Sequence, residues 1–319
     1  MTALSFLSCG GGGSSPTDPP SPGQPGFTVV AVVYYDENGD GQPGNQERAR
    51  IPDVEVLAGS RSARSEKGTG RAVVGAVPAG AQTVSLRPDT LPPFYRAGAA
   101  VPIQVPLGEG SQVLLPVTLP IGQDSLPNVY MAFGDSLTKG EGFGGGYPAR
   151  LEGLLRAHFA DALVPNRGAD ATNSYEARER LRRNLAGNRP AMTLILYGTN
   201  DWHIPGCQND PSSCPTPENL RLVVQEVKAF GSLPFLATIP PVNPTINPGR
   251  NDWVAAVNTR IRPVAQEEGA FLVDLFETFR RRSDLASLFS DDVHLNDAGY
   301  QVMAEAFFEA IAHGRSVPP

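Results

Sequence analysis

Apolar residues in the first third of the chain occur in short runs of the kind that form strands. The run at 27–35 is rich in β-branched and aromatic residues, and turn residues separate it from the runs that follow. Those further runs lie at 54–57, 71–77, 82–87, 103–105 and 112–118. No helical periodicity occurs before residue 120. The pattern therefore predicts a small all-β sandwich domain over residues 27–120.

Beyond residue 128 the pattern changes to short apolar runs that alternate with amphipathic segments. The predicted strands are 129–133, 162–164, 192–197, 234–239 and 271–275. The predicted helices are 147–160, 175–186, 217–230, 251–268 and about 297–312. This alternation predicts an α/β domain with a five-stranded parallel sheet flanked by helices. Ligands of such sheets bind at the carboxyl ends of the strands.

Composition sets the remaining boundaries. Residues 10–26 are almost all Gly, Ser, Pro and polar residues, so residues 1–26 are predicted to be a leader and a disordered tether. Residues 121–127 are predicted to be a linker, which leaves 128–319 for the α/β domain. A hydrophobic content of 40% and a net charge of −7 fit a globular protein. The absence of a basic stripe argues against a nucleic-acid partner.

The first residues resemble the end of a bacterial lipoprotein signal. An apolar stretch and Ser8 precede Cys9, and a Gly/Ser stretch follows it. The resemblance implies an exported bacterial protein, anchored through a lipid on Cys9 at the cell surface or in the periplasm. No apolar run approaches the ~20 residues of a membrane span, so this anchor is the membrane contact we expect. The alternative is a disordered leader with an incidental cysteine.

The other two cysteines, Cys207 and Cys214, lie in a loop rich in Pro, Ser and Asn. A disulfide that closes this short loop suits an exported protein. Two free thiols are the alternative. Zinc is disfavoured because no further Cys or His stands at ligand spacing.

Four polar residues at strand ends or in loops together suit nucleophilic catalysis. Ser136 follows the first predicted strand of the α/β domain, and Asn200 follows the third. Asp291 and His294 stand three positions apart far downstream. A serine becomes a good nucleophile when a neighbouring imidazole takes its proton, and a carboxylate can fix the tautomer of that imidazole. The set predicts ester hydrolysis through an acyl-enzyme, with no catalytic cofactor.

Four motifs in this part of the chain resemble those of the GDSL, or SGNH, hydrolase family. They are Gly-Asp-Ser-Leu-Thr at 134–138, Asn-Arg-Gly-Ala-Asp-Ala-Thr at 166–172, Gly-Thr-Asn-Asp at 198–201 and Asp-Asp-Val-His at 291–294. The resemblance covers residues 128–313 and implies a flavodoxin-like SGNH fold. It also favours Asp291 over Asp292 as the partner of the histidine.

The same resemblance implies an oxyanion hole made by the backbone N–H of Ser136, a backbone N–H of the second motif and the Asn200 amide. Ala171 stands where the family usually has glycine, and a backbone donor survives that change if its φ is negative. Gly168 is the fallback donor. Trp202 and His203 follow Asn200 and are candidates for the substrate pocket. His158 and His313 fall in predicted helices and are expected on the surface.

The first domain carries a candidate calcium loop at 36–47. Oxygen-bearing side chains stand at loop positions 1, 3, 5 and 12, with glycine at position 6. The candidate ligands are Asp36, Asn38, Asp40, Gln42 and Glu47. The preceding strand and the Ile-Pro-Asp-Val-Glu-Val segment at 51–56 resemble the B-type repeat domains of bacterial surface proteins, which are prealbumin-like modules. The alternative is a solvated Asp/Gly turn.

The expected substrate is a small-molecule or glycan ester, with deacetylation of a carbohydrate favoured. A lipase, lysophospholipase or thioesterase of the same family is the alternative. A different class is a cell-surface binding or adhesion protein with a degenerate hydrolase domain, against which the intact set of four polar residues argues. The sequence predicts no oligomeric state.

Overall fold

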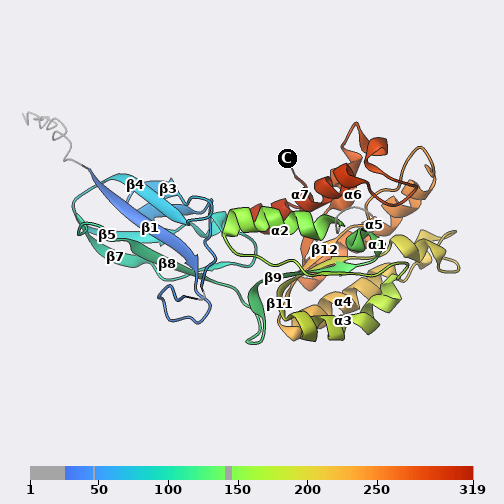
Figure 1. The fold of residues 1–319 in the computed structure, drawn as a ribbon, viewed down its shortest axis with the longest axis horizontal. Helices are drawn as coiled ribbons and strands as arrows, with labels where there is room; N and C mark the ends of the chain where they lie inside the picture. The colour runs from blue at the N-terminus through green and yellow to red at the C-terminus, as the bar shows by residue number, and fades with distance from the viewer. Residues whose placement is uncertain (1–25, 46, 141–145, 319) are drawn as a thin grey trace, which may run out of the picture.

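The computed structural model describes residues 26–45, 47–140 and 146–318. Its N-terminal part holds two four-stranded sheets, ordered β4-β1-β8-β6 and β3-β2-β5-β7 (Figure 1). The strands are β1 Phe27–Tyr35, β2 Glu55–Ala58, β3 Arg61–Arg64, β4 Arg71–Val77, β5 Gly80–Leu86, β6 Arg96–Ala97, β7 Val101–Val105 and β8 Val113–Thr118, with a 3-10 turn η1 at Pro88–Thr90. All neighbours pair antiparallel except β1 and β8. The predicted all-β architecture is confirmed, although the short strands β3 and β6 escaped the sequence pattern.

The second part is built on one five-stranded parallel sheet of order β10-β9-β11-β12-β13. Its strands are β9 Leu126–Gly134, β10 Asn166–Gly168, β11 Pro190–Leu196, β12 Leu233–Ala237 and β13 Phe271–Val273. Every residue of the central strand β11 is buried, as expected for a sheet covered on both faces. The predicted α/β fold class is confirmed.

Helices cover both faces of this sheet (Figure 1). They are α1 Ser136–Lys139, α2 Gly146–Phe159, α3 Ser174–Asn188, α4 Thr216–Phe230, α5 Arg250–Glu268, α6 Leu275–Arg280 and α7 Asp297–His313, with 3-10 turns η2 Thr199–His203, η3 Pro211–Ser213 and η4 Leu285–Leu288. Leu151 of α2 and Phe307 of α7 belong to one buried cluster, whereas Leu181 of α3 and Val254 of α5 belong to a second. The sheet lies between the two clusters. Within the described residues, no helix has the length and apolar character needed to cross a bilayer.

The edge strand of the sheet is not where the sequence pattern placed it. The apolar run 162–164 makes only an isolated bridge, between Leu163 and Val129, and the Leu163 side chain is exposed. The ladder instead forms at β10, where Asn166–Gly168 pairs with the end of β9. An edge strand pairs on one side only, so it needs no apolar alternation, and its polar sequence gave no strand signal.

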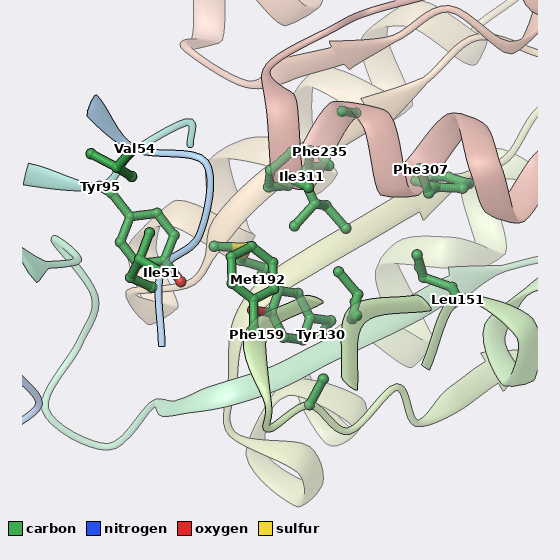
Figure 2. Close-up of a cluster of buried hydrophobic side chains, with 14 of the residues drawn as sticks. Ile51, Val54, Tyr95, Tyr130, Leu151, Phe159, Met192, Phe235, Phe307 and Ile311 are labelled. Carbon is green, nitrogen blue, oxygen red and sulfur yellow. The ribbon is translucent and has the colours of Figure 1, made fainter. Parts of the chain in front are cut away.

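The two parts share one hydrophobic core. Tyr95 of the β module stacks on Phe159 at the end of α2, with ring centroids 6.5 Å apart, and both rings are labelled in Figure 2. Phe94 meets Phe235 of β12 edge-on at 5.5 Å. Backbone bonds add to this contact, since the Arg50 N–H donates to the Phe159 carbonyl at 3.0 Å. The β module is therefore packed directly on the α2 side of the five-stranded sheet.

Candidate active site

Ser136 is positioned by the turn that follows β9. The Asp135 side chain caps α1 by accepting the Leu137 N–H at 3.0 Å. Gly134 ends the strand so close to β11 that a Cβ there would lie 2.5 Å from the Leu196 carbonyl oxygen. Only glycine fits this approach, and the turn leaves Ser136 half-buried at the carboxyl edge of the sheet.

His294 joins Ser136 to Asp291. Its Nε2 lies 3.0 Å from the Ser136 Oγ, and its Nδ1 lies 2.8 Å from one carboxylate oxygen of Asp291. The other oxygen of Asp291 accepts the backbone N–H groups of Val293, at 2.8 Å, and His294, at 2.6 Å. Burial opposes ionisation of Asp291, but these bonds outweigh it and lower its pKa. The carboxylate is thus held ionised beside the imidazole.

Backbone contacts hold the loop that carries Asp291 and His294. The Ser290 N–H donates to the His294 carbonyl at 2.8 Å, and Phe289 bridges Leu295. From the loop after β12, the Asn243 side chain donates to the Asp291 carbonyl at 3.2 Å. The segment is therefore fixed at both ends of the Asp-x-x-His motif.

Asn200 lies on η2, directly after β11, and its amide nitrogen donates to the Thr172 carbonyl at 2.9 Å. A primary amide carries two hydrogens, so one remains for another acceptor. Ala171 has a φ of 56°, and its N–H makes no hydrogen bond within the part of the chain described here. Gly168, by contrast, already donates its N–H to the Asn166 side chain at 3.0 Å. Of the two backbone candidates, Ala171 has the available donor.

The left-handed conformation of Ala171 differs from the negative φ that the sequence argument required. This conformation costs an alanine about 1–2 kcal/mol, whereas glycine adopts it without that cost. The N–H itself is retained whatever the sign of φ, so the substitution keeps the donor at a cost in backbone strain.

Two buried aspartates that sequence reasoning missed support this site. Asp201 is fully buried and accepts bonds from the Ser174 hydroxyl and the Thr216 hydroxyl, both at 2.5 Å. It also accepts the Ser174 N–H at 2.8 Å, so it joins the segments that follow β10 and β11. In the sequence, this residue is marked only as the aspartate that follows Asn200 in the third motif.

The second is Asp135, which is fully buried next to the nucleophile. One of its oxygens has no hydrogen-bond partner among the described residues. Burial, aided by the charge of Asp201, raises its pKa to about 7, and the Leu137 N–H and His294 oppose that rise. Burial therefore opposes ionisation of Asp135 beside the nucleophile.

Trp202 and His203 differ in their surroundings. The Trp202 ring meets Trp253 edge-on at 5.4 Å, and the Arg250 guanidinium lies over it at 5.4 Å. His203 is exposed at the end of η2. Trp202 is thus partly buried and packs on α5, whereas His203 is exposed.

The nearby cysteines Cys207 and Cys214 form a disulfide and are both buried. The Trp253 indole N–H donates to the Cys207 carbonyl at 2.8 Å. The disulfide loop is therefore attached to α5. The sequence left a disulfide or two free thiols open, and the structure contains the disulfide.

The candidate calcium loop converges on two buried carboxylates, Asp36 and Glu47. The Asp36 oxygens accept the N–H groups of Gly39, at 2.7 Å, and Gly41, at 3.0 Å. Those of Glu47 accept the N–H groups of Glu37, at 2.8 Å, and Gly44, at 2.6 Å. The backbone thus wraps around oxygen groups whose remaining lone pairs suit a hard cation.

Negative charge accumulates around this loop. Burial, then the charges of Asp36, Glu47 and Asp40, raise the pKa of Tyr34 to about 12. Burial and Glu47 also raise the pKa of Glu37. Asn38 and Asp40 are bonded to each other and exposed, and Gln42 donates its N–H to Asp40 at 2.7 Å. A bound cation would offset this charge.

We expect Asp291→Asn to lower kcat by about 10²- to 10⁴-fold, because an amide does not hold the imidazole tautomer that leaves Nε2 free to accept the Ser136 proton. Asp292→Asn is the matched control, since the Asp292 carboxylate interacts with Arg250. Steady-state hydrolysis of p-nitrophenyl acetate measures both variants. Equal losses in the two would contradict the assignment of Asp291.

Comparison with known proteins agrees with this arrangement. Residues 132–302, more than half of the 319-residue chain, match the GDSL-like lipase/acylhydrolase family. The chain is similar in fold to a lipase/acylhydrolase from Enterococcus faecalis, at 18% identity and a TM-score of 0.50, covering 58% of this chain and 95% of that one. No curated protein matches it.

A second solved structure of similar fold is a catalytic mutant of Axe2, an acetylxylan esterase from Geobacillus stearothermophilus. It has 22% identity and a TM-score of 0.50, covering 61% of this chain and 98% of that one. The resemblance of the four motifs to the GDSL family is confirmed by the family match. The chain therefore belongs to the GDSL-like lipase/acylhydrolase family and is a carboxylic ester hydrolase.

Proposed function

We propose that the protein is an exported serine esterase that removes acetyl groups from a carbohydrate. The observation that carries the catalytic part is the chain of contacts from Ser136 through His294 to Asp291, with separations of 3.0 and 2.8 Å. These distances lie within the range for proton transfer between a nucleophile, its base and the group that orients the base.

In the proposed reaction the Ser136 Oγ attacks the ester carbonyl carbon while the His294 Nε2 takes the hydroxyl proton. The tetrahedral intermediate collapses, its carbon–oxygen bond to the alcohol breaks, and the imidazolium protonates the leaving alcohol. Water then attacks the acyl-enzyme with His294 again as base, which releases the acid and restores Ser136. Asp291 keeps the Nδ1 proton in place throughout.

The oxyanion needs donors that are already in position. The Ser136 N–H and the Ala171 N–H supply two in this proposal, and the second amide hydrogen of Asn200 supplies a third. The bond from Asn200 to the Thr172 carbonyl fixes the amide plane. The loop that carries both Ala171 and Thr172 is in turn attached to Asp201 through Ser174.

Support for a carbohydrate substrate comes from polar surroundings and from fold likeness. Thr172, Asn173 and Asn200, on the two segments proposed to supply the oxyanion hole, are all polar and partly exposed. One structure of similar fold is an acetylxylan esterase. A lipase, lysophospholipase or thioesterase activity is the second candidate. The adhesion alternative loses support because the contacts needed for hydrolysis are present.

A substrate panel separates these candidates. We expect kcat/KM to be highest for acetyl esters, including acetylated xylooligosaccharides, and to fall by about tenfold or more with p-nitrophenyl octanoate, since a site shaped for a short acyl group rejects added methylenes. Ser136→Ala gives the background rate. Preference for the octanoyl ester would reject the deacetylase proposal and keep the esterase. Activity equal to that of Ser136→Ala would reject both.

We further propose that the loop of Asp36 and Glu47 binds Ca²⁺ and that the β module, which resembles B-type repeats, acts as a spacer. Ca²⁺ in excess should raise the melting temperature by several degrees, because a ligand at about 100 times its Kd adds ~2.7 kcal/mol of stability. Asp36→Asn should abolish the response to Ca²⁺. Asp89→Asn, an exposed aspartate on η1, is the control. Identical melts with and without chelator would contradict the proposal.

Export and lipid anchoring rest on Cys9, which lies outside the described residues. We propose that Cys9 becomes the lipid-modified N-terminus of the mature protein. Mass spectrometry of the protein from its native host should show a diacylglyceryl cysteine. A mature chain that still begins with an unmodified Met1 would rule this out.

A further inference from the structure

Three potential metal ligands meet where the β module contacts the hydrolase domain. Asp53 comes from the module, His158 from the last turn of α2, and His313 is the final residue of α7. One ligand atom from each lies within 4.8 Å of the others. Ligands of a tetrahedral ion with bonds of ~2.1 Å stand ~3.4 Å apart, so modest side-chain rotation brings all three onto one ion.

The burial of His158 is the strongest sign of a ligand. Its side chain was expected on the surface, but the residue is only 2% exposed, and neither ring nitrogen has a hydrogen-bond partner among the described residues. A buried polar group without a partner costs about 1–3 kcal/mol. An ion bound to a ring nitrogen, with Asp53 and His313 as its other ligands, would remove this cost.

The charge state of His158 suits this role. Burial, with help from His313 and Lys67, lowers its pKa to about 4, and Asp53 alone opposes that shift. Burial thus favours the neutral imidazole, which is the form that binds metals. The exposed Lys67 is a cation near the site, where its charge counts against ion binding.

The fold adds negative potential at the same place. His158 and His313 stand in the last turns of α2 and α7, and helix C-termini favour cations. Phe159 and Phe308 contact the His158 ring edge-on, with centroids 4.6 and 5.2 Å away. These rings exclude water on two sides, which strengthens electrostatic attraction within the site.

The backbone of Asp53 is held in position for this contact. Its φ is 59°, a left-handed conformation that aspartate tolerates better than most residues. Its N–H donates to the Ser65 carbonyl at 2.8 Å, and its own carbonyl accepts a bond from the Arg64 side chain. The carboxylate is thus presented by a turn with fixed geometry.

We propose that Asp53, His158 and His313 bind a divalent first-row transition-metal ion that joins the β module to the hydrolase domain. Two imidazoles and one carboxylate suit Zn²⁺, with water as the fourth ligand. Ca²⁺ and Mg²⁺ prefer oxygen ligands and should not compete.

The ion would be structural. The 17 residues of α7 separate His313 from Asn296, which caps the start of that helix just after His294. At ~1.5 Å per residue this is ~25 Å, so the ion has no contact with the reacting atoms. Removing it should lower stability and leave the esterase rate of the folded enzyme unchanged.

The test uses the full chain without an affinity tag, dialysed against chelator and titrated with Zn²⁺. We expect one Zn²⁺ per chain by calorimetry and a rise in melting temperature. His313→Gln and Asp53→Asn, both at partly exposed positions, should each weaken Zn²⁺ binding by more than about 100-fold. Removal of a residue that only hydrogen-bonds to a metal ligand already lowers metal affinity by ~10- to 100-fold. His158→Leu removes the third ligand while keeping an apolar side chain of similar bulk.

His203→Gln is the matched control, because this exposed histidine lies elsewhere, on η2; it should bind Zn²⁺ as the unaltered protein does. Circular dichroism checks that each variant is folded, and p-nitrophenyl acetate hydrolysis adds a second check for His313→Gln, Asp53→Asn and His158→Leu. No Zn²⁺ binding by the unaltered protein would overturn the proposal. Binding that survives undiminished in His313→Gln, Asp53→Asn and His158→Leu would do the same, because the ion would then be elsewhere.

Discussion

The close approach of β9 and β11 at Gly134 is the constraint on which the active site depends. A Cβ at this position would lie 2.5 Å from the Leu196 carbonyl oxygen, so the two strands can end together only because the residue is glycine. The next two residues are the cap of α1 and the nucleophile. Leu196, the last residue of β11, is paired with Gly134, the last residue of β9. Asn200 therefore follows β11 at the same edge of the sheet at which Ser136 follows β9. Nucleophile and amide donor are therefore brought together by strand register.

Buried carboxylates keep this edge in place. Asp201 carries a raised pKa because it is buried, but three bonds from Ser174 and Thr216 offset the cost. Asp135 is less compensated, with a single bond from Leu137. The second oxygen of Asp135 has no partner among the described residues, so burying this carboxyl beside Ser136 costs stability. Asp201 therefore stabilises this edge of the sheet, whereas the burial of Asp135 costs stability.

Much of this could be predicted from the sequence because it depends on local pattern. Apolar runs located β9, β11, β12 and β13, and four short motifs identified Ser136, Asn200, Asp291 and His294. What could not be predicted depends on tertiary contact. β10 is a polar edge strand that pairs only because β9 is beside it. His158 was expected on the surface because histidine is polar, yet it lies on the buried face of α2 with Leu151 and Leu155 and packs against Phe308 and His313 of α7. The left-handed backbone of Ala171 could not be predicted either, because alanine, unlike glycine, does not indicate a positive φ.

The junction between the two parts bears on the spacer hypothesis. A spacer that is joined to the catalytic domain by a flexible linker sets the distance of that domain from the attachment point but not its orientation. Here Tyr95 stacks on Phe159, and the Arg50 and Gly68 N–H groups donate to carbonyls at the end of α2. The orientation of the β module relative to the hydrolase domain is therefore fixed as well. β1 begins at the end of the module remote from the hydrolase sheet, and α1 with the carboxyl edge lies at the opposite end of the molecule (Figure 1). The start of β1 and the catalytic edge therefore lie at opposite ends of one packed body.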